Sequence, residues 1–540
     1  MRRIVGAGLW VLFLLGLWLL VFRPRPAPTP ALPAPWGRLA AALAAGDLAA
    51  LRALAERPGY AAVVAARALA EDPRVPAAER VRWVRAAVAF EGRPALLWGA
   101  ELLVRLGAPD LAVSYYRRAI GEPAARAALV RLAREGNAAA IEALFRAGRY
   151  RAVLPYLRRP EDRGRALLGL GRYREALSLL ADPEDRGRAL LALGRSPQAA
   201  AAFRQAGDFL GLGRALLAEG RRAAAVAAFL KASDRGLWEA AGALEKAEPA
   251  RAVALYLRLA GRAGELGDAA AYRAYQLARR RGDGALVERA YRALRGGYAA
   301  LAGKPLGRLS FKPLPPAPRG LRVVRALARA GRWDWARGEA RYRAAAARGA
   351  EARAWAWVLY RLGDYPAAAR YGGPRLRYPT PWRAWVLARA QRAGLDPWLL
   401  YAVIRVESAF DPRAVSPTGA QGLLQFTDAT WREVAARLGE APADPRDPRA
   451  AIRYGAYYLG ALLRRFGDVR LALIAYNGGP GYVARGLRRY RNFEDFWRFQ
   501  PRDEPRRYLG RVARDWAIYR ALASRPRREP GFLAGFPSPP

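Results

Sequence analysis

Few residue types in this chain can move protons near neutral pH. The sequence contains no histidine and no cysteine, which excludes imidazole bases, thiol nucleophiles and metal sites built on either side chain. Acid–base chemistry must come from Asp, Glu, Lys or Tyr. Glu407 is the most distinctive candidate. Leu400, Val403 and Ile404 precede it at helical spacing, so that Glu407 shares the apolar face of a predicted helix.

The predicted helix covers residues 398–410. Asp396 can cap it, Pro397 suits its first turn, and Asp411 followed by proline stops it. Burial disfavours the ionised form of Glu407, and the negative end of the helix dipole adds to that effect. Both raise the pKa of the carboxyl, as a general acid near neutral pH requires. The alternative is a Glu407 that reaches solvent or pairs with an arginine.

Three polar motifs follow this helix. A loop with repeated glycines covers 416–425, a sharp helix–loop–helix corner covers 475–481, and residues 504–509 begin a last amphipathic helix. The corner on its own is typical of a plain turn. Together the motifs supply a hydroxyl, amides and phenols around one acidic group, a set that suits the hydroxyl and acetamide groups of a carbohydrate.

With these motifs, residues 378–522 resemble the catalytic domain of soluble lytic transglycosylases, relatives of goose-type lysozyme. The family pattern has Glu-Ser, then Ser-x-x-Gly-Ala-x-Gly-Leu-Met-Gln, then Ala-Tyr-Asn-Ala-Gly, then Glu-Thr-Arg-x-Tyr-Val. Here these stretches are matched by Glu407–Ser408, 416–425, 475–479 and 504–509. The chain departs from the pattern at Leu424, Gly478, Pro505 and Leu509, and at Ala451, where the family often has Asn.

The resemblance implies an enzyme that cleaves the β-1,4 bond between N-acetylmuramic acid (MurNAc) and N-acetylglucosamine (GlcNAc) in peptidoglycan. Glu407 would act first as acid and then as base, and the product would be 1,6-anhydro-MurNAc. Ser416 and Tyr476 would orient or polarise Glu407. The expected substrate contacts are Ser408, Gln425, Asn477, Glu504 and Tyr508. No metal or cofactor is implied. Asp411 and Asp428 are the nearest other carboxylates, and we interpret them as a helix stop and a helix cap.

The rest of the chain predicts an all-α protein with a long α-solenoid at 37–310. The stretch 160–168 recurs unchanged at 183–191, and glycine turns recur between amphipathic helices. Such helix pairs must stack on their neighbours to bury their apolar faces. The solenoid either binds partners on a concave surface or acts as a spacer. A Pro-rich linker at 311–320 and tetratricopeptide-like helical repeats at 321–376 lead to the lysozyme-like transglycosylase domain at 377–524.

The N-terminus predicts export. An uncharged, mostly apolar run at 4–22 would span about 28 Å as a helix, close to a bilayer core. We interpret 1–23 as a membrane anchor, with a cleaved signal or a buried core helix as alternatives, and 24–36 as a stiff Pro-rich spacer. Residues 525–540 form a basic, Pro-rich tail. The protein is expected in the cell envelope or periplasm, anchored in the inner membrane.

The charge balance is strongly basic, with 92 Lys and Arg against 46 Asp and Glu, a net charge of +46. This favours polyanionic partners, although biased codon usage can also produce it. No nucleic-acid-binding motif accompanies the charge, so no nucleic acid is expected. The expected partners are peptidoglycan strands and, through the solenoid, the membrane surface or wall-synthesis proteins. A hydrolytic muramidase of the same fold and a non-catalytic envelope scaffold remain as alternatives.

Overall fold

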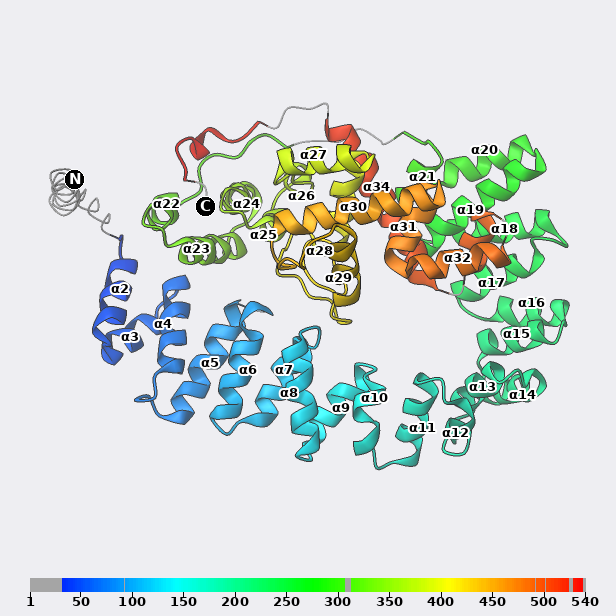
Figure 1. Cartoon of the computed structure of the whole chain (residues 1–540), viewed down its shortest axis with the longest axis horizontal. Coiled ribbons are helices and arrows are strands. Elements are labelled where there is room, and N and C mark those ends of the chain that lie inside the picture. Colours follow the sequence, from blue (N-terminus) through cyan, green and yellow to red (C-terminus); the bar gives the residue numbers. More distant parts are fainter. Residues whose placement is uncertain are drawn as a thin grey trace, which may run out of the picture. The chain divides into compact units, whose positions relative to one another are not determined.

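The computed structural model describes residues 32–91, 93–305, 312–490, 492–500, 502–523 and 528–537. Every regular element in these ranges is a helix, apart from isolated bridges in one loop, and the predicted all-α class is confirmed (Figure 1). The predicted membrane segment 4–22 lies outside the described residues. Within them, no helix has both the length and the apolar character needed to cross a bilayer.

The described chain divides into two compact units. The first, called the terminal unit, contains residues 32–75, 314–364 and 529–537. It combines three segments that the sequence predicted as separate: the start of the solenoid, the helical repeats after the Pro-rich linker, and part of the tail at 525–540. Its helices are α2 (Trp36–Ala45), α3 (Leu48–Ala55), α4 (Tyr60–Glu71), α22 (Leu321–Arg329), α23 (Trp333–Ala346) and α24 (Gly349–Arg361), with a 3-10 turn η2 (Gly531–Leu533).

Aromatic contacts join the two halves of the terminal unit. The ring of Trp36 lies 5.0 Å from that of Trp335 and 6.2 Å from that of Tyr60. Gly338 lets α23 approach α4, because a Cβ at this position would lie 1.8 Å from the Tyr60 ring. The unit is therefore held by contacts between residues far apart in the sequence.

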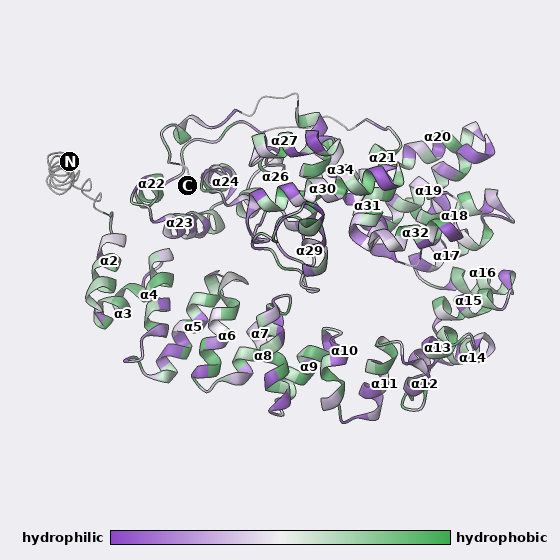
Figure 2. Ribbon diagram, viewed as in Figure 1, coloured by the Kyte–Doolittle hydropathy of each residue, from purple (hydrophilic) through white to green (hydrophobic). Residues whose placement is uncertain are grey.

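The second, called the main unit, begins with a solenoid. Each helix from α5 to α20 packs on its neighbours in sequence, and hydrophilic and hydrophobic residues are interspersed along these helices (Figure 2). The solenoid helices are α5 (Ala77–Glu91), α6 (Arg93–Arg105), α7 (Pro109–Arg118), α8 (Pro123–Arg134), α9 (Ala138–Arg146), α10 (Tyr150–Val153), η1 (Leu154–Tyr156), α11 (Pro160–Gly169), α12 (Tyr173–Leu177), α13 (Pro183–Ala192), α14 (Ser196–Ala206), α15 (Phe209–Ala218), α16 (Arg222–Lys231), α17 (Asp234–Leu244), α18 (Pro249–Ala260), α19 (Glu265–Arg281), α20 (Gly284–Ala293) and α21 (Gly296–Leu301).

The two sequence copies become the helices α11 and α13, each of which starts at a proline. Their shared glycine serves packing. A Cβ at Gly164 would lie 2.9 Å from the Leu180 side chain, and a Cβ at Gly187 would lie 2.8 Å from the Phe203 ring. Each copy of the repeat thus places a glycine where a side chain of the following segment approaches closely.

A C-terminal helical bundle completes the main unit. The helices α28 and α31 are buried almost all round, which makes them its central helices, and α34 packs along both. The bundle contains α25 (Tyr365–Tyr371), α26 (Pro374–Arg377), α27 (Arg383–Ala393), α28 (Pro397–Ser408), α29 (Asp428–Arg437), α30 (Pro448–Phe466), α31 (Val469–Gly478), α32 (Pro480–Arg489), α33 (Phe493–Phe499) and α34 (Asp503–Ala523).

The solenoid and the bundle meet at a buried ionic network. The guanidinium of Arg273 donates to both oxygens of Glu245, at 3.0 and 2.6 Å, and to Asp495 at 3.1 Å. Tyr256 donates to Glu245 at 2.7 Å and accepts from Arg498. Because Glu245 and Arg273 belong to the solenoid while Arg498 lies in α33, the network ties the bundle to the solenoid.

Candidate active site

Glu407 is the second-last residue of α28. The helix ends at Ser408, two residues earlier than predicted, because Ala409 and Phe410 adopt left-handed backbone angles, with φ of 52° and 67°. Such angles are uncommon for residues other than glycine, so the sequence gives no signal for this helix end. The predicted cap is confirmed, since the Asp396 carboxylate accepts from the backbone N–H of Trp398 at 2.9 Å.

An ion pair beside the site holds α28 against α34. Arg405 donates to Asp515 at 2.7 Å, and the Asp515 side chain is fully buried. The hydroxyl of Tyr378 also donates to Asp515, at 3.3 Å. Because Arg405 lies two residues before Glu407, this pair fixes the end of the helix that carries the carboxyl. Sequence analysis missed it, because its partners are far apart in the chain.

Burial raises the pKa of Glu407 to about 7. The charge of Glu504 adds to the increase, while Tyr508 and Arg511 oppose it. The carboxyl is partly buried and lies at the junction of α28, α31 and α34. A carboxyl with this pKa is half protonated near neutral pH, so that it can donate a proton and later accept one.

Two tyrosines lie near the carboxyl. The rings of Tyr476 and Tyr508 are stacked 6.3 Å apart with an interplanar angle of 2°. For both phenols, burial first and the Glu407 charge second raise the pKa above its usual range. Tyr476 donates to the backbone carbonyl of Leu424 at 2.8 Å. The buried Tyr508 hydroxyl makes no hydrogen bond of ordinary geometry to any described residue. Tyr508 is nonetheless the neutral donor that lies close enough to the carboxyl to oppose its raised pKa.

The loop between α28 and α29 is organised by its own polar side chains. The Ser416 hydroxyl accepts from the backbone N–H of Ala420 at 2.9 Å and pairs with Thr418 at 2.9 Å. The Gln425 amide donates to the carbonyls of Ala414 and Gly422 at 3.0 and 2.9 Å. These groups shape the loop that Tyr476 holds through Leu424, and the hydrogen bonds of the Ser416 hydroxyl lie within the loop.

The remaining predicted residues lie at the surface or edge of the site. Ser408 is partly buried and its hydroxyl donates to the carbonyl of Ile404 at 3.2 Å. Asn477 is exposed near the end of α31. Glu504 is exposed and accepts from Arg511 at 2.6 Å. Sequence analysis missed Arg511, although its place one helical turn after Tyr508 could have indicated it.

The other nearby carboxylates have structural partners. Asp411 accepts from the backbone N–H of Arg413 at 2.9 Å, within the turn after α28. Asp428 accepts from Gln421 at 3.2 Å and is the first residue of α29. The interpretation of Asp428 as the helix cap is wrong, because the cap is Thr427, whose hydroxyl accepts from the backbone N–H of Thr430 at 3.3 Å. Among the residues with described positions, no group of three or more acidic side chains could hold a metal ion.

The raised pKa of Glu407 predicts a pH-dependent effect on stability. The folded value of about 7 exceeds the reference value of 4.5, so the folded state binds more protons than the unfolded state between these values. Stability contributed by this group is present below pH 4.5 and is lost as the pH rises through 7. Between pH 4 and pH 8 we expect the parent to lose about 3 kcal/mol of unfolding free energy that the Glu407→Gln variant keeps. Chemical denaturation of both proteins at each pH measures this difference.

The matched control is Glu433→Gln, which removes one carboxylate of an exposed pair with Arg437. Its stability difference from the parent should change by less than about 1 kcal/mol over the same range. Equal pH dependence in the two variants would show that Glu407 titrates as an ordinary exposed carboxyl.

The bundle matches a known domain family. The model described as "Transglycosylase SLT domain" covers residues 385–498, which include Glu407 and Tyr476 but end before Tyr508. The chain is 41% identical over 107 residues to the "Transglycosylase" of Enterobacteria phage PRD1. It is 38% identical over 128 residues to "Membrane-bound lytic murein transglycosylase F 1" of Alkalilimnicola ehrlichii.

These alignments involve 20% and 22% of this chain, and they span only 38% and 24% of the two relatives. Among solved structures, lytic transglycosylase Slt of Pseudomonas aeruginosa aligns over 86% of each chain, with 23% identity and a TM-score of 0.44. The 70 kDa soluble lytic transglycosylase of Escherichia coli aligns over 90% of this chain and 91% of its own, with 17% identity and a TM-score of 0.47. Both superpositions are loose. Residues 385–498 match the model of the transglycosylase SLT domain, and both sequence relatives carry transglycosylase names.

Proposed function

We propose that the protein is a peptidoglycan lytic transglycosylase that cleaves the MurNAc–GlcNAc β-1,4 bond. The observation that carries this proposal is a single carboxyl, Glu407, whose pKa is raised by burial to about 7 beside two neutral tyrosines. The SLT domain match and the printed names of the relatives, which are transglycosylases, support the same activity.

In the proposed mechanism, Glu407 performs both proton transfers. Protonated Glu407 donates its proton to the glycosidic oxygen as the bond to C1 of MurNAc breaks. The resulting carboxylate then accepts the proton of the C6 hydroxyl of the same sugar, whose oxygen attacks C1. The products are a free GlcNAc 4-hydroxyl and a 1,6-anhydro-MurNAc end, and the carboxyl returns to its protonated form. Because the nucleophile belongs to the substrate, a second carboxylate is not needed.

The proposed roles of the other site residues follow from their contacts. Tyr508, the nearest donor, would stabilise the carboxylate form of Glu407. Tyr476 and Ser416 would support catalysis by fixing the loop, Tyr476 through Leu424 and Ser416 through Ala420. The proposed substrate contacts are Ser408, Gln425, Asn477, Glu504 and Tyr508, with Arg511 added because it pairs with Glu504 and opposes the raised pKa of Glu407.

Mass spectrometry of the fragments released from purified peptidoglycan tests the proposal. We expect muropeptides that end in 1,6-anhydro-MurNAc, each lighter by one water than a hydrolytic product. Reducing-end MurNAc would instead establish a hydrolytic muramidase of the same fold. No release by the parent chain, under conditions in which it is folded, would favour the non-catalytic envelope scaffold. The readout therefore separates all three functions.

We also propose a location in the bacterial cell envelope. The apolar run at 4–22 supports export with an inner-membrane anchor, and the "membrane-bound" relative supports the same compartment. The proposed organisation is a membrane segment, a Pro-rich spacer, a tetratricopeptide-like solenoid and a lysozyme-like catalytic domain at 377–524. The solenoid would contact the membrane surface or wall-synthesis proteins, and peptidoglycan strands would occupy the catalytic domain.

A further inference from the structure

A basic hollow of about 500 Å³ lies in the C-terminal bundle, apart from the candidate active site. Arginines from two helices line it: Arg389 and Arg392 on α27, and Arg453 and Arg464 on α30. Glu440 is the acidic residue in its lining, and it pairs with Arg453. The apolar part of the wall includes Leu438, Ala456 and Tyr457.

The arginines of this hollow carry more positive charge than the protein neutralises. No ion pair links Arg389, Arg392 or Arg464 to a carboxylate among the described residues. The Nε of Arg389 is buried and has no hydrogen-bond partner there. Burial first, and then the charges of Arg392 and Arg453, lower the pKa of Arg389. Like charges that converge on a concave surface raise the free energy of the empty site and favour an anion within it.

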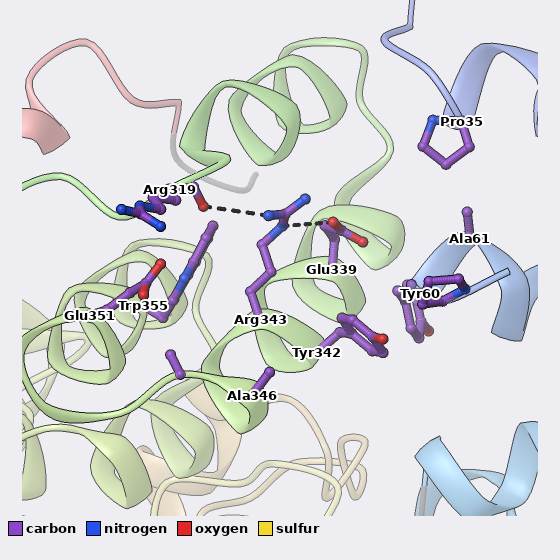
Figure 3. A pocket seen from close by; sticks show the side chains of 13 residues that line it. Pro35, Tyr60, Ala61, Arg319, Glu339, Tyr342, Arg343, Ala346, Glu351 and Trp355 are labelled. Atoms are coloured by element: carbon purple, nitrogen blue, oxygen red, sulfur yellow. Dashed lines mark hydrogen bonds and ion pairs between the residues drawn. The ribbon is translucent and has the colours of Figure 1, made fainter.

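The hollow of the terminal unit provides a contrast. It measures about 360 Å³ and is also lined by arginines, Arg319 and Arg343, together with Glu339 and Glu351. Figure 3 shows the Arg343 side chain reaching Glu339, to which it donates at 2.7 Å. Charge is balanced there within the lining itself. The excess of positive charge is thus a property of the hollow in the C-terminal bundle. The arginine-lined hollow of the terminal unit does not share it.

We propose that this hollow, bounded by α27, α30 and the segment after α29, binds a phosphate group. A carboxylate can be satisfied by one arginine fork, whereas a phosphate has three terminal oxygens and accepts from several guanidinium groups at once. The volume exceeds that of one phosphate and falls within the range of small-ligand pockets. Tyr457 and Leu438 can cover the organic part of a phosphate ester.

Isothermal titration of the full chain at constant ionic strength tests the site. The probes are inorganic phosphate, inorganic pyrophosphate and glycerophosphoglycerol, the water-soluble headgroup of phosphatidylglycerol. We expect pyrophosphate to bind the parent, and Arg389→Gln combined with Arg392→Gln to weaken binding by about 100-fold, since each lost charged hydrogen bond costs about tenfold. Tighter binding of glycerophosphoglycerol than of inorganic phosphate would identify a lipid headgroup as the source, and the reverse order a soluble phosphate.

The control carries the same change in charge elsewhere in the bundle. Arg432→Gln combined with Arg488→Gln alters exposed residues of α29 and α32 outside the hollow and should leave binding unchanged. Unaltered peptidoglycan digestion would show that the hollow variant remains folded. Equal loss in both double variants, absence of binding to the parent, or equally tight binding of a tricarboxylate such as citrate would each overturn the proposal.

Discussion

Replacement of Glu407 by Gln is expected to lower the rate of peptidoglycan cleavage by about 10²–10⁴-fold. The amide has nearly the same shape as the carboxyl, but it can neither donate a proton to the glycosidic oxygen nor accept one from the C6 hydroxyl. The nearby Asp411 and Asp428 cannot substitute without breaking the turn and the loop contact that they make. Turbidity of a peptidoglycan suspension measures the rate.

The control for this variant is again Glu433→Gln, which removes an exposed carboxylate in the same bundle. It should cleave peptidoglycan at the parent rate. A Glu407→Gln variant that is folded and as active as the parent would exclude Glu407 as the acid. It would leave the remaining acidic residues, beginning with Glu504, as candidates.

Replacement of Arg273 by Ala is expected to cost about 3–5 kcal/mol of stability. Arg273 is fully buried and satisfies both oxygens of Glu245, which is itself 8% exposed. Its loss leaves a carboxylate without its main partner in a low-dielectric junction. Chemical denaturation followed by tryptophan fluorescence suits the measurement, because Trp238 and Trp497 lie at this junction with ring centroids 6.1 Å apart.

Activity should fall together with stability in this variant. Arg498 and Arg506, on the helices that lead to Tyr508, donate to the backbone of the same junction. The control is Arg292→Ala, which breaks an exposed pair with Glu288 in the solenoid and should cost less than about 1 kcal/mol. Similar losses in both variants would show that the junction is not a distinct source of stability.

The candidate site was partly predictable from sequence, because several of its residues belong to short local sequence patterns. Leu400, Val403 and Ile404 mark the buried face of α28, and the same spacing places Glu407 on it. The motif around Tyr476 and the motif at the start of the last helix predicted the two tyrosines as site residues. Their stacking on each other beside one carboxyl depends on how three helices pack, which no local pattern encodes.

The features that the sequence did not predict are long-range contacts and unusual backbone angles. The Arg405–Asp515 pair joins residues 110 positions apart, and Arg273 reaches Asp495 across 222 positions. A single sequence contains no pattern that indicates contact between residues so far apart. The early end of α28 depends on left-handed angles at Ala409 and Phe410, where composition predicts continued helix. The grouping of 32–75 with 314–364 into one unit has the same origin, since it rests on contacts such as Trp36 with Trp335.

The most direct test of the central claim is a measurement of the pH at which Glu407 loses its proton. Infrared difference spectroscopy of the parent against Glu407→Gln isolates the C=O stretch of this one protonated carboxyl. We expect the band to persist at pH 6 and to disappear with a midpoint near pH 7, as the raised pKa of Glu407 requires. A midpoint near the reference value of 4.5 would contradict it, because Glu407 would then be ionised at neutral pH and unable to act as the acid.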